Sequence, residues 1–388
     1  MTESEKVSSG RKRKVATTSA VAIVLLLVVM LVLALLEGQG LLDYLSALID
    51  FVQGTSPLDT PGGGWYQVYF TSPQYPDDEE DHFGGIDEEL VALINDAQSS
   101  VDVAAYELDL ENVAEALIEA HERGVVVRLV TDTDNVGETA VQKMRRAGIP
   151  VVDDDRNSIM HNKFVIIDGD TVLTGSWNLT ENGTYRNNNN AIVIHSPALA
   201  ENYEAEFEEM FEDKEFGPDA FTETPNRRVS IMGEIGEAEM AIVENYFAPE
   251  DEVTMQIVEH LQEANQSIYF MAFSFTDDRI GKLVADKYTA GLEVKGVFET
   301  RGSDVEYGEY TRMRGLGMDV FVDGNPYIMH HKVFIIDGQK VILGSFNFSR
   351  SADESNDENI LIITDPDIAQ AYLAEFQRIY AQASTDID

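Results

Sequence analysis

Two stretches of the sequence, MHNKFVIIDGDTVLTGSWN at 160–178 and MHHKVFIIDGQKVILGSFN at 329–347, repeat one pattern. Each contains a histidine, a lysine two positions later, four apolar residues, an aspartate–glycine pair and then Gly-Ser-x-Asn. Aspartate–glycine between two apolar runs is typical of a tight turn joining antiparallel strands. Each stretch is therefore predicted to form a β-hairpin.

The spacing within each hairpin predicts which side chains share a face. Residues two apart on a strand point to the same side of the sheet, so each histidine is expected to project with its lysine. The strand returning from the turn can bring the serine and the asparagine back beside them. An imidazole, an ammonium, a hydroxyl and an amide at one place suit a phosphate group: polar donors hold its oxygens and the imidazole reaches phosphorus.

The repetition extends beyond the hairpins. DEELVALINDAQSSVDVAAYEL at 87–108 corresponds to TMQIVEHLQEANQSIYFMAFSF at 254–275, and both pass from a helical apolar pattern into a β-rich run. Strands alternating with helices predict an α/β protein with a mixed, largely parallel sheet covered by helices. We expect a first half at 65–213, an irregular connecting segment at 214–240 and a second half at 241–388.

Composition excludes several kinds of chemistry. The 388 residues contain no cysteine, which rules out disulfides, thiolate metal sites and a cysteine nucleophile. The formal net charge of -43 disfavours binding to a nucleic-acid backbone at low ionic strength. At molar salt the Debye length shrinks to roughly 3 Å, and this repulsion nearly vanishes. A salt-rich habitat and an ordinary acidic extracytoplasmic protein both fit the charge.

The segment 1–64 is expected to hold a membrane anchor and a linker. Residues 16–36 carry no charge, and 21 helical residues at about 1.5 Å each cross a hydrocarbon core of about 30 Å. The basic run 11–14 before them predicts a cytoplasmic N-terminus and an extracytoplasmic body in a single-pass membrane protein. A cleaved signal peptide is the alternative, with Gly38 and Gly40 as the small residues after the run.

The paired pattern HxKxxxxD and GSxN resembles the phospholipase D superfamily over about residues 65–385. The resemblance implies a duplicated α-β-α sandwich whose halves are related by a pseudo-twofold axis, with both motifs at one cleft. It implies catalysis without a metal or another cofactor, in which one histidine attacks phosphorus and the other protonates the leaving alcohol. The catalytic residues it implies are His161, Lys163, Asp168, His330, Lys332 and Asp337. Setting the hairpin turn is an alternative role for the two aspartates.

The residues implied to bind the substrate phosphate or to support the site are Ser176, Asn178, Ser345, Asn347 and Glu358. Members of the superfamily often place an acidic residue downstream, where it hydrogen-bonds the motif histidine. Glu358 has that position after His330, whereas Asn189 has it after His161. A carboxylate stabilises a cationic imidazole and an amide only orients it, so the two histidines are predicted to be inequivalent. His331, between His330 and Lys332, is expected to face the helical layer.

The expected function is that of a phospholipase D-type lipid phosphodiesterase that acts as a monomer beside its membrane. Its substrate would be a phospholipid or another phosphodiester. An endonuclease of the same superfamily is the first alternative, although the net charge disfavours nucleic acid. A cardiolipin-synthase-like transferase and an inactive scaffold are two others.

Overall fold

The computed structural model describes residues 64–385, except for 222, 233–238 and 304–307. These residues belong to one compact unit of the chain, Pro57–Asp388. The expected membrane segment at 16–36 lies outside the described residues. Within the described part, none of the helices has the length and apolar character needed to cross a bilayer.

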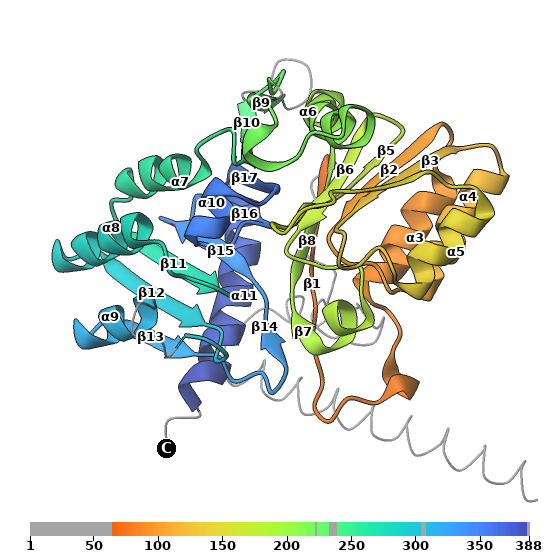
Figure 1. The fold of residues 1–388 in the computed structure, drawn as a ribbon. Helices are drawn as coiled ribbons and strands as arrows, with labels where there is room; N and C mark the ends of the chain where they lie inside the picture. Colours follow the sequence, from red (N-terminus) through yellow and green to blue (C-terminus); the bar gives the residue numbers. More distant parts are fainter. Residues whose placement is uncertain (1–63, 222, 233–238, 304–307, 386–388) are drawn as a thin grey trace, which may run out of the picture. The chain divides into compact units, whose positions relative to one another are not determined.

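The first half contains a seven-stranded sheet with three helices on its outer face (Figure 1). Helices α3, α4 and α5 bury an apolar stripe against this sheet, as the helical patterns predicted. The helices are α3 (Ile86–Asp96), α4 (Glu111–Glu122) and α5 (Thr139–Ala147). In spatial order the strands are β1 (Tyr66–Phe70), β8 (Asn190–His195), β6 (Thr171–Gly175), β5 (Lys163–Ile167), β2 (Ser100–Ala105), β3 (Val126–Thr131) and β4 (Val151–Asp153).

The second half repeats this arrangement with one added edge strand. Its eight strands, in spatial order, are β13 (Asp319–Val322), β12 (Glu293–Phe298), β11 (Ser267–Ala272), β15 (Lys332–Ile336), β16 (Lys340–Gly344), β17 (Glu358–Thr364), β10 (Glu239–Ala248) and β9 (Arg228–Met232). Its outer helices are α7 (Val253–Gln262), α8 (Asp278–Thr289) and α9 (Glu309–Gly315). The duplication predicted from the sequence is confirmed.

Two details of the predicted fold are wrong. The sheets are mixed but not largely parallel: β2, β3 and β4 run parallel, whereas β2–β5, β5–β6, β6–β8 and β8–β1 pair antiparallel. The motif hairpin lies inside the sheet, and a hairpin can only contribute antiparallel pairs. The connecting segment at 214–240 is not wholly irregular either, because it supplies β9, which pairs with β10.

A shared core joins the halves. Helices α6 (Pro197–Glu208) and α11 (Pro366–Thr385) contribute Tyr203 and Tyr372 to one buried cluster that also draws apolar residues from both sheets. Figure 1 shows the outer helices of the two halves at opposite sides, with α11 running between the sheets. Burial of this cluster holds the inner faces of the halves together.

The backbone also crosses between the halves. Strand β14 (Ile328–Met329) pairs with β7 (Asn187–Asn188), and Met160 pairs with Asp357 in the same way. Each pair joins the residues just before one motif histidine to the residues just before β8 or β17 of the other half. Such reciprocal contacts are what a twofold relation produces.

Candidate active site

The two motif histidines lie at a single site. Lys163 and Lys332 both act to lower the pKa of His161, and both lysines together with His161 act on His330. Burial is the largest cause of the lowered pKa of each histidine. The exposed fraction of each histidine is below a tenth. Two histidines and two lysines, brought from distant parts of the chain, therefore form one cluster.

Each histidine is held by the other half of the protein. The Nδ1 atom of His161 lies 2.7 Å from Glu358 Oε2, and Nδ1 of His330 lies 2.9 Å from Asn189 Oδ1. The spacing in the sequence predicted Glu358 beside His330 and Asn189 beside His161, and this pairing is wrong. The predicted inequivalence remains, with the carboxylate on His161 and the amide on His330.

The crossed pairing follows from the backbone bridges between the halves. The amide of His161 donates to the carbonyl of Asp357 at 2.9 Å, and the amide of His330 donates to the carbonyl of Asn188 at 2.8 Å. The residue after each of these carbonyls is the histidine partner. Sequence distance alone gives no sign of this exchange, because it depends on how the halves meet.

The Gly-Ser pair of each motif positions those partners. The Ser345 hydroxyl donates to Glu358 Oε2 at 2.7 Å, and the Ser176 hydroxyl donates to Asn189 Oδ1 at 2.9 Å. Both serines are fully buried. They therefore have the supporting role that was one of the two expected for them, and the other, direct binding of phosphate, is corrected.

The glycine before each serine allows a close approach of neighbouring strands. Gly175 has φ +155, and a Cβ there would lie 2.3 Å from the carbonyl oxygen of Asn190. Gly344 has φ +147, with a Cβ 2.2 Å from the carbonyl of Asn359. A larger residue would push the strands apart and displace the serine hydroxyl that follows.

The two lysines supply positive charge at the floor of the site. Nζ of Lys163 donates to the carbonyl of His161 at 2.8 Å, and Nζ of Lys332 donates to that of His330 at 2.9 Å. Burial lowers the pKa of Lys163 to about 7, although Glu358 opposes the shift, and burial lowers the pKa of Lys332 as well. A bound phosphate would restore both positive charges, so this cluster favours an anion.

Aromatic rings frame the histidines and lysines in both halves. Tyr106, just after β2, packs edge-on to His161 with ring centroids 5.0 Å apart, and Lys163 Nζ lies 5.1 Å from its ring centre. Phe273, just after β11, meets His330 at 4.7 Å and Lys332 at 4.9 Å in the same way. Neither ring was predicted from the sequence, although their equivalent places at the ends of repeated strands were a usable signal.

The asparagines of the two GSxN motifs have side-chain oxygens without hydrogen-bond partners. The side-chain oxygens of Asn178 and Asn347 are buried and have no hydrogen-bond partner. The amide nitrogen of Asn178 donates to Glu107 at 3.3 Å. Buried polar atoms without partners are rare in folded proteins and mark places where a ligand or water completes the bonding.

The motif aspartates lie away from this cluster. Asp168 and Asp337 follow the far ends of β5 and β15, about seven residues from the histidines, or roughly 20 Å along an extended strand. Each has positive φ, and each accepts backbone amides of the loop before the neighbouring strand, namely 98–100 and 265–267. They hold the hairpin turn, which is the alternative role expected from the sequence, and their inclusion among the catalytic residues is corrected.

A second polar layer lies behind the motif strands. His331 faces the helical layer as expected, with Nε2 3.1 Å from Glu375 of α11 and Nδ1 2.9 Å from the Asn190 amide. Its counterpart Asn162 donates to Glu206 of α6 at 2.9 Å. Asn190 and its counterpart Asn359 were missed, although an asparagine directly after each histidine partner was a repeated signal in the sequence.

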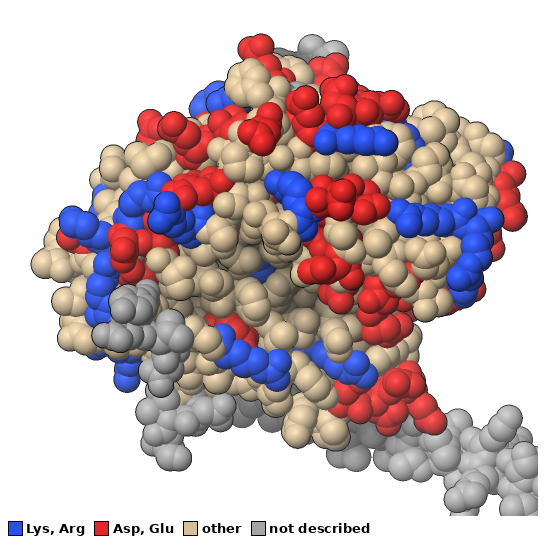
Figure 2. All heavy atoms as spheres, in the orientation of Figure 1, with Lys and Arg blue, Asp and Glu red and all other residues tan. Residues whose placement is uncertain are grey.

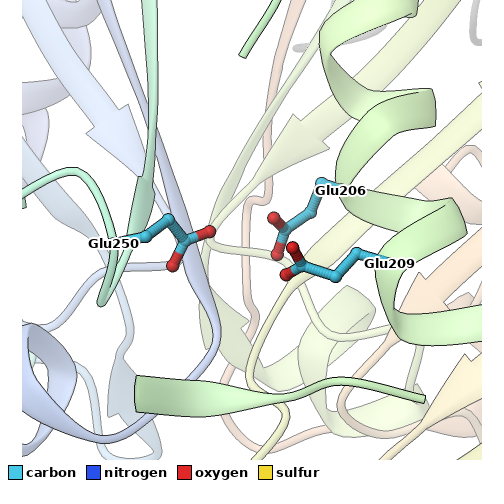
Figure 3. Close-up of side chains that lie close together, drawn as sticks. All are labelled: Glu206, Glu209 and Glu250. Carbon is cyan, nitrogen blue, oxygen red and sulfur yellow. The ribbon is translucent and has the colours of Figure 1, made fainter. Parts of the chain in front are cut away.

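Among the described residues, Glu206, Glu209 and Glu250 form a compact group of possible metal ligands behind this layer. Figure 3 shows their carboxyl groups pointing toward one another from α6, from the turn after it and from the segment after β10. Glu206 and Glu250 are hydrogen-bonded to each other, and burial raises the pKa of Glu250 to about 7. A retained proton between them accounts for this contact without a cation.

Glu250→Gln is therefore expected to raise the melting temperature by several degrees at about pH 8 and to change it little at about pH 5. The pKa of Glu250 is higher in the folded protein than its usual 4.5, so the native state binds more protons between about pH 4.5 and 7. Stability from this group is present at low pH and is lost as the pH rises through that window. Glutamine removes the charge that develops.

Thermal unfolding of both proteins at the two pH values checks this expectation. Glu259→Gln, on an exposed part of α7, is the matched control for loss of one carboxylate. A lower melting temperature for Glu250→Gln, together with destabilisation of the unaltered protein by a chelator at about pH 8, would contradict the shared proton and favour a cation instead.

A comparison with known families agrees with the duplicated site. The family described as cardiolipin synthase, PLD-like domain, matches the chain twice, over residues 90–211 and 257–380. The chain belongs to the phospholipase D superfamily. Each match contains one complete motif of this superfamily, so the resemblance inferred from the two motifs is confirmed.

Individual relatives cover parts of the chain. A phospholipase D from Rickettsia typhi is 35% identical over 131 residues, 34% of this chain and 64% of the relative. A mitochondrial cardiolipin hydrolase from Xenopus tropicalis is 34% identical over 143 residues, 36% of this chain and 67% of that protein. A phosphatidylserine synthase structure from Haemophilus influenzae covers 81% of this chain and 86% of its own, with a TM-score of 0.59 and 13% identity, and shows the common fold.

Proposed function

We propose that this phospholipase D superfamily protein hydrolyses the headgroup ester of a phospholipid to phosphatidic acid, without a metal, through a phosphohistidine intermediate. The observation that carries the proposal is the joint cluster of His161, His330, Lys163 and Lys332, in which each histidine contacts a residue of the other half. Relatives named phospholipase D and mitochondrial cardiolipin hydrolase support a lipid phosphodiester as the substrate class.

The geometry supports Nε2 of each motif histidine as the reacting atom in this proposal. Nδ1 of each histidine is engaged by Glu358 or Asn189, which leaves Nε2 of each ring for the substrate. One Nε2 attacks phosphorus and forms an N–P bond, while the bond from phosphorus to the headgroup oxygen breaks. The other Nε2 gives its proton to the departing alcohol. It then takes a proton from water, whose oxygen attacks phosphorus and releases the first histidine.

The two lysines and the partners of the two histidines stabilise the charges that form during the reaction. The ammonium groups of Lys163 and Lys332 stabilise the negative charge that grows on the phosphate oxygens in the crowded intermediate. Glu358 stabilises the cationic form of His161, and Asn189 orients His330 without adding charge. The pocket thus supplies a nucleophile, an acid and two cations from this chain's own residues.

The membrane placement is a further part of the proposal and rests on the sequence. An uncharged run at 16–36 after the basic run 11–14 would tether the catalytic body on the extracytoplasmic side, next to its substrate. The family description cardiolipin synthase favours a second candidate, in which an alcohol replaces water and the phosphatidyl group is transferred.

The full-length chain, purified in detergent, tests the function. We expect it to release phosphatidic acid from phosphatidylcholine or cardiolipin and to turn over bis(p-nitrophenyl) phosphate, with unchanged rates in a chelator. Release of diacylglycerol would show cleavage of the other phosphoester bond and contradict the proposal. Complete inhibition by a chelator would contradict catalysis without a metal. Added glycerol distinguishes the second candidate, because a transferase would form phosphatidylglycerol.

A further inference from the structure

The two halves carry different charges at equivalent positions of the loops that follow their matching strands. The loops after β2 and β11 follow the rings of Tyr106 and Phe273, and the loops after β3 and β12 lie beside them. At matching places the first half has carboxylates and the second half has hydroxyls and a guanidinium. The three pairs are Glu107 with Ser274, Asp109 with Thr276, and Asp134 with Arg301.

Glu107 lies close to Lys163 and Asn178 of the first motif. It lines a small cavity together with Lys163 and Asn178, and it accepts the amide nitrogen of Asn178 at 3.3 Å. Burial raises the pKa of Glu107, and the nearby charges of Asp109 and Glu138 raise it further. A substrate group leaving the phosphate site on this side therefore enters a concentration of negative charge.

The matching place in the second half favours the opposite charge. A cavity of about 160 Å³ borders Phe273 and is lined by residues that include Ser274, Thr276, Arg301 and Ser303. The Arg301 side chain is exposed and makes no ion pair with any described residue. Figure 2 shows the same contrast: acidic side chains gather beside the central hollow on the side of the first half, while the opposite side is mostly uncharged.

A polynucleotide and a lipid would place different charges beside the carboxylates of the first half. A polynucleotide has a phosphate on both sides of the one being cleaved, so one neighbour must approach the carboxylates of the first half. A glycerophospholipid with an amine headgroup has one phosphate, and its headgroup is cationic. Repulsion between like charges at close range excludes the polynucleotide, and attraction between opposite charges favours the lipid headgroup.

We propose that Glu107, together with Asp109 and Asp134, makes the cleft selective for substrates that contain a single phosphodiester and whose group facing the first half is cationic or uncharged. The same three carboxylates repel polynucleotides. This inference rests on the proposed phosphodiesterase function and names the substrate class of the same site. Glu107 acts here as a specificity residue because it lies against the groups that hold the phosphate.

The test makes the first half resemble the second. The cleft variant of the full-length chain combines three substitutions that copy the residues of the second half: Glu107→Ser, Asp109→Thr and Asp134→Arg. We expect the ratio of kcat/KM for a single-stranded oligonucleotide to that for short-chain phosphatidylcholine to rise at least 10-fold, about 1.4 kcal/mol of discrimination. The increase should shrink at molar salt, where charges are screened over roughly 3 Å.

A matched control changes the net charge equally on α4, away from the cleft. It combines Glu115→Gln, Glu119→Gln and Glu122→Arg, all exposed, and it should leave the ratio unchanged. Glu107→Gln alone keeps the size of the side chain and should move the ratio in the same direction as the triple variant, which guards against misfolding of the latter.

Two results would overturn the selectivity. One is an equal ratio in the cleft variant and the α4 variant, and the other is efficient oligonucleotide cleavage by the unaltered protein at low salt. Turnover of bis(p-nitrophenyl) phosphate separates the two proposals. If the unaltered protein turns over this substrate but the kcat/KM ratios of the cleft and α4 variants do not differ, only the proposed selectivity fails. If the unaltered protein does not turn it over, the phosphodiesterase function fails and the selectivity with it.

Discussion

Replacing either His161 or His330 with alanine is expected to lower kcat/KM for phosphatidylcholine by at least about 10³-fold. Both rings belong to one cluster, and each has Nε2 directed away from the Nδ1 partner that orients it. Loss of the attacking ring removes the covalent intermediate, and loss of the other leaves an alkoxide without a proton. Steady-state hydrolysis of the lipid measures both losses.

A better leaving group should separate the two roles. Bis(p-nitrophenyl) phosphate releases a weakly basic phenolate that needs little protonation, so the variant without the general acid should still give a burst of product. The variant without the nucleophile should give none. His121→Ala, on α4, is the control histidine variant and should behave like the unaltered protein. Full lipid turnover by either cluster variant would refute the shared site.

Glu358→Gln is expected to lower kcat/KM about 10²-fold through His161, which belongs to the opposite half. Burial raises the pKa of Glu358 to about 7, against the opposing effects of Lys163 and Ser345. Above that pH the ionised carboxylate stabilises a cationic or phosphorylated His161, and below it the stabilisation is lost. The acid limb of the kcat/KM profile near pH 7 should therefore disappear in the variant.

Ring-nitrogen NMR of the histidines checks the crossed pairing directly. Glu358→Gln should shift the signals of His161 and leave those of His330 nearly unchanged, and Asn189→Asp should do the reverse. Asn189→Asp also loses the donation from its amide nitrogen to the carbonyl of Gly183 at 2.9 Å, so some loss of stability is expected there. Shifts confined to the histidine of the same half would show that the pairing is not crossed.

The sequence predicted well whatever depends on local spacing. The i, i+2 rule placed His161 with Lys163, and it placed His331 on the opposite side of its strand, toward α11. The aspartate–glycine pairs gave the hairpins, and helical periodicity gave the outer helices. The repeated motif, together with the resemblance that it carries, predicted two packed halves.

What the sequence did not predict depends on contacts between halves. The partner of His161 comes from β17 because the backbone of Met160 pairs with Asp357, a contact far apart in the chain. The serine hydroxyls were assigned to phosphate, since strand spacing cannot reveal that Ser345 reaches Glu358 first. Glu107 went unnoticed because its meaning appears only when it is compared with Ser274 across the cleft.

The reciprocal bridges have a consequence for how activity could be lost or regulated. Each half holds the motif histidine that the other half supplies, and the backbone bridges β7 with β14 and Met160 with Asp357 place the contacting residues. Neither half can operate as an autonomous catalyst in this arrangement. A shift of a few ångströms between the halves would therefore separate both imidazoles from their partners together.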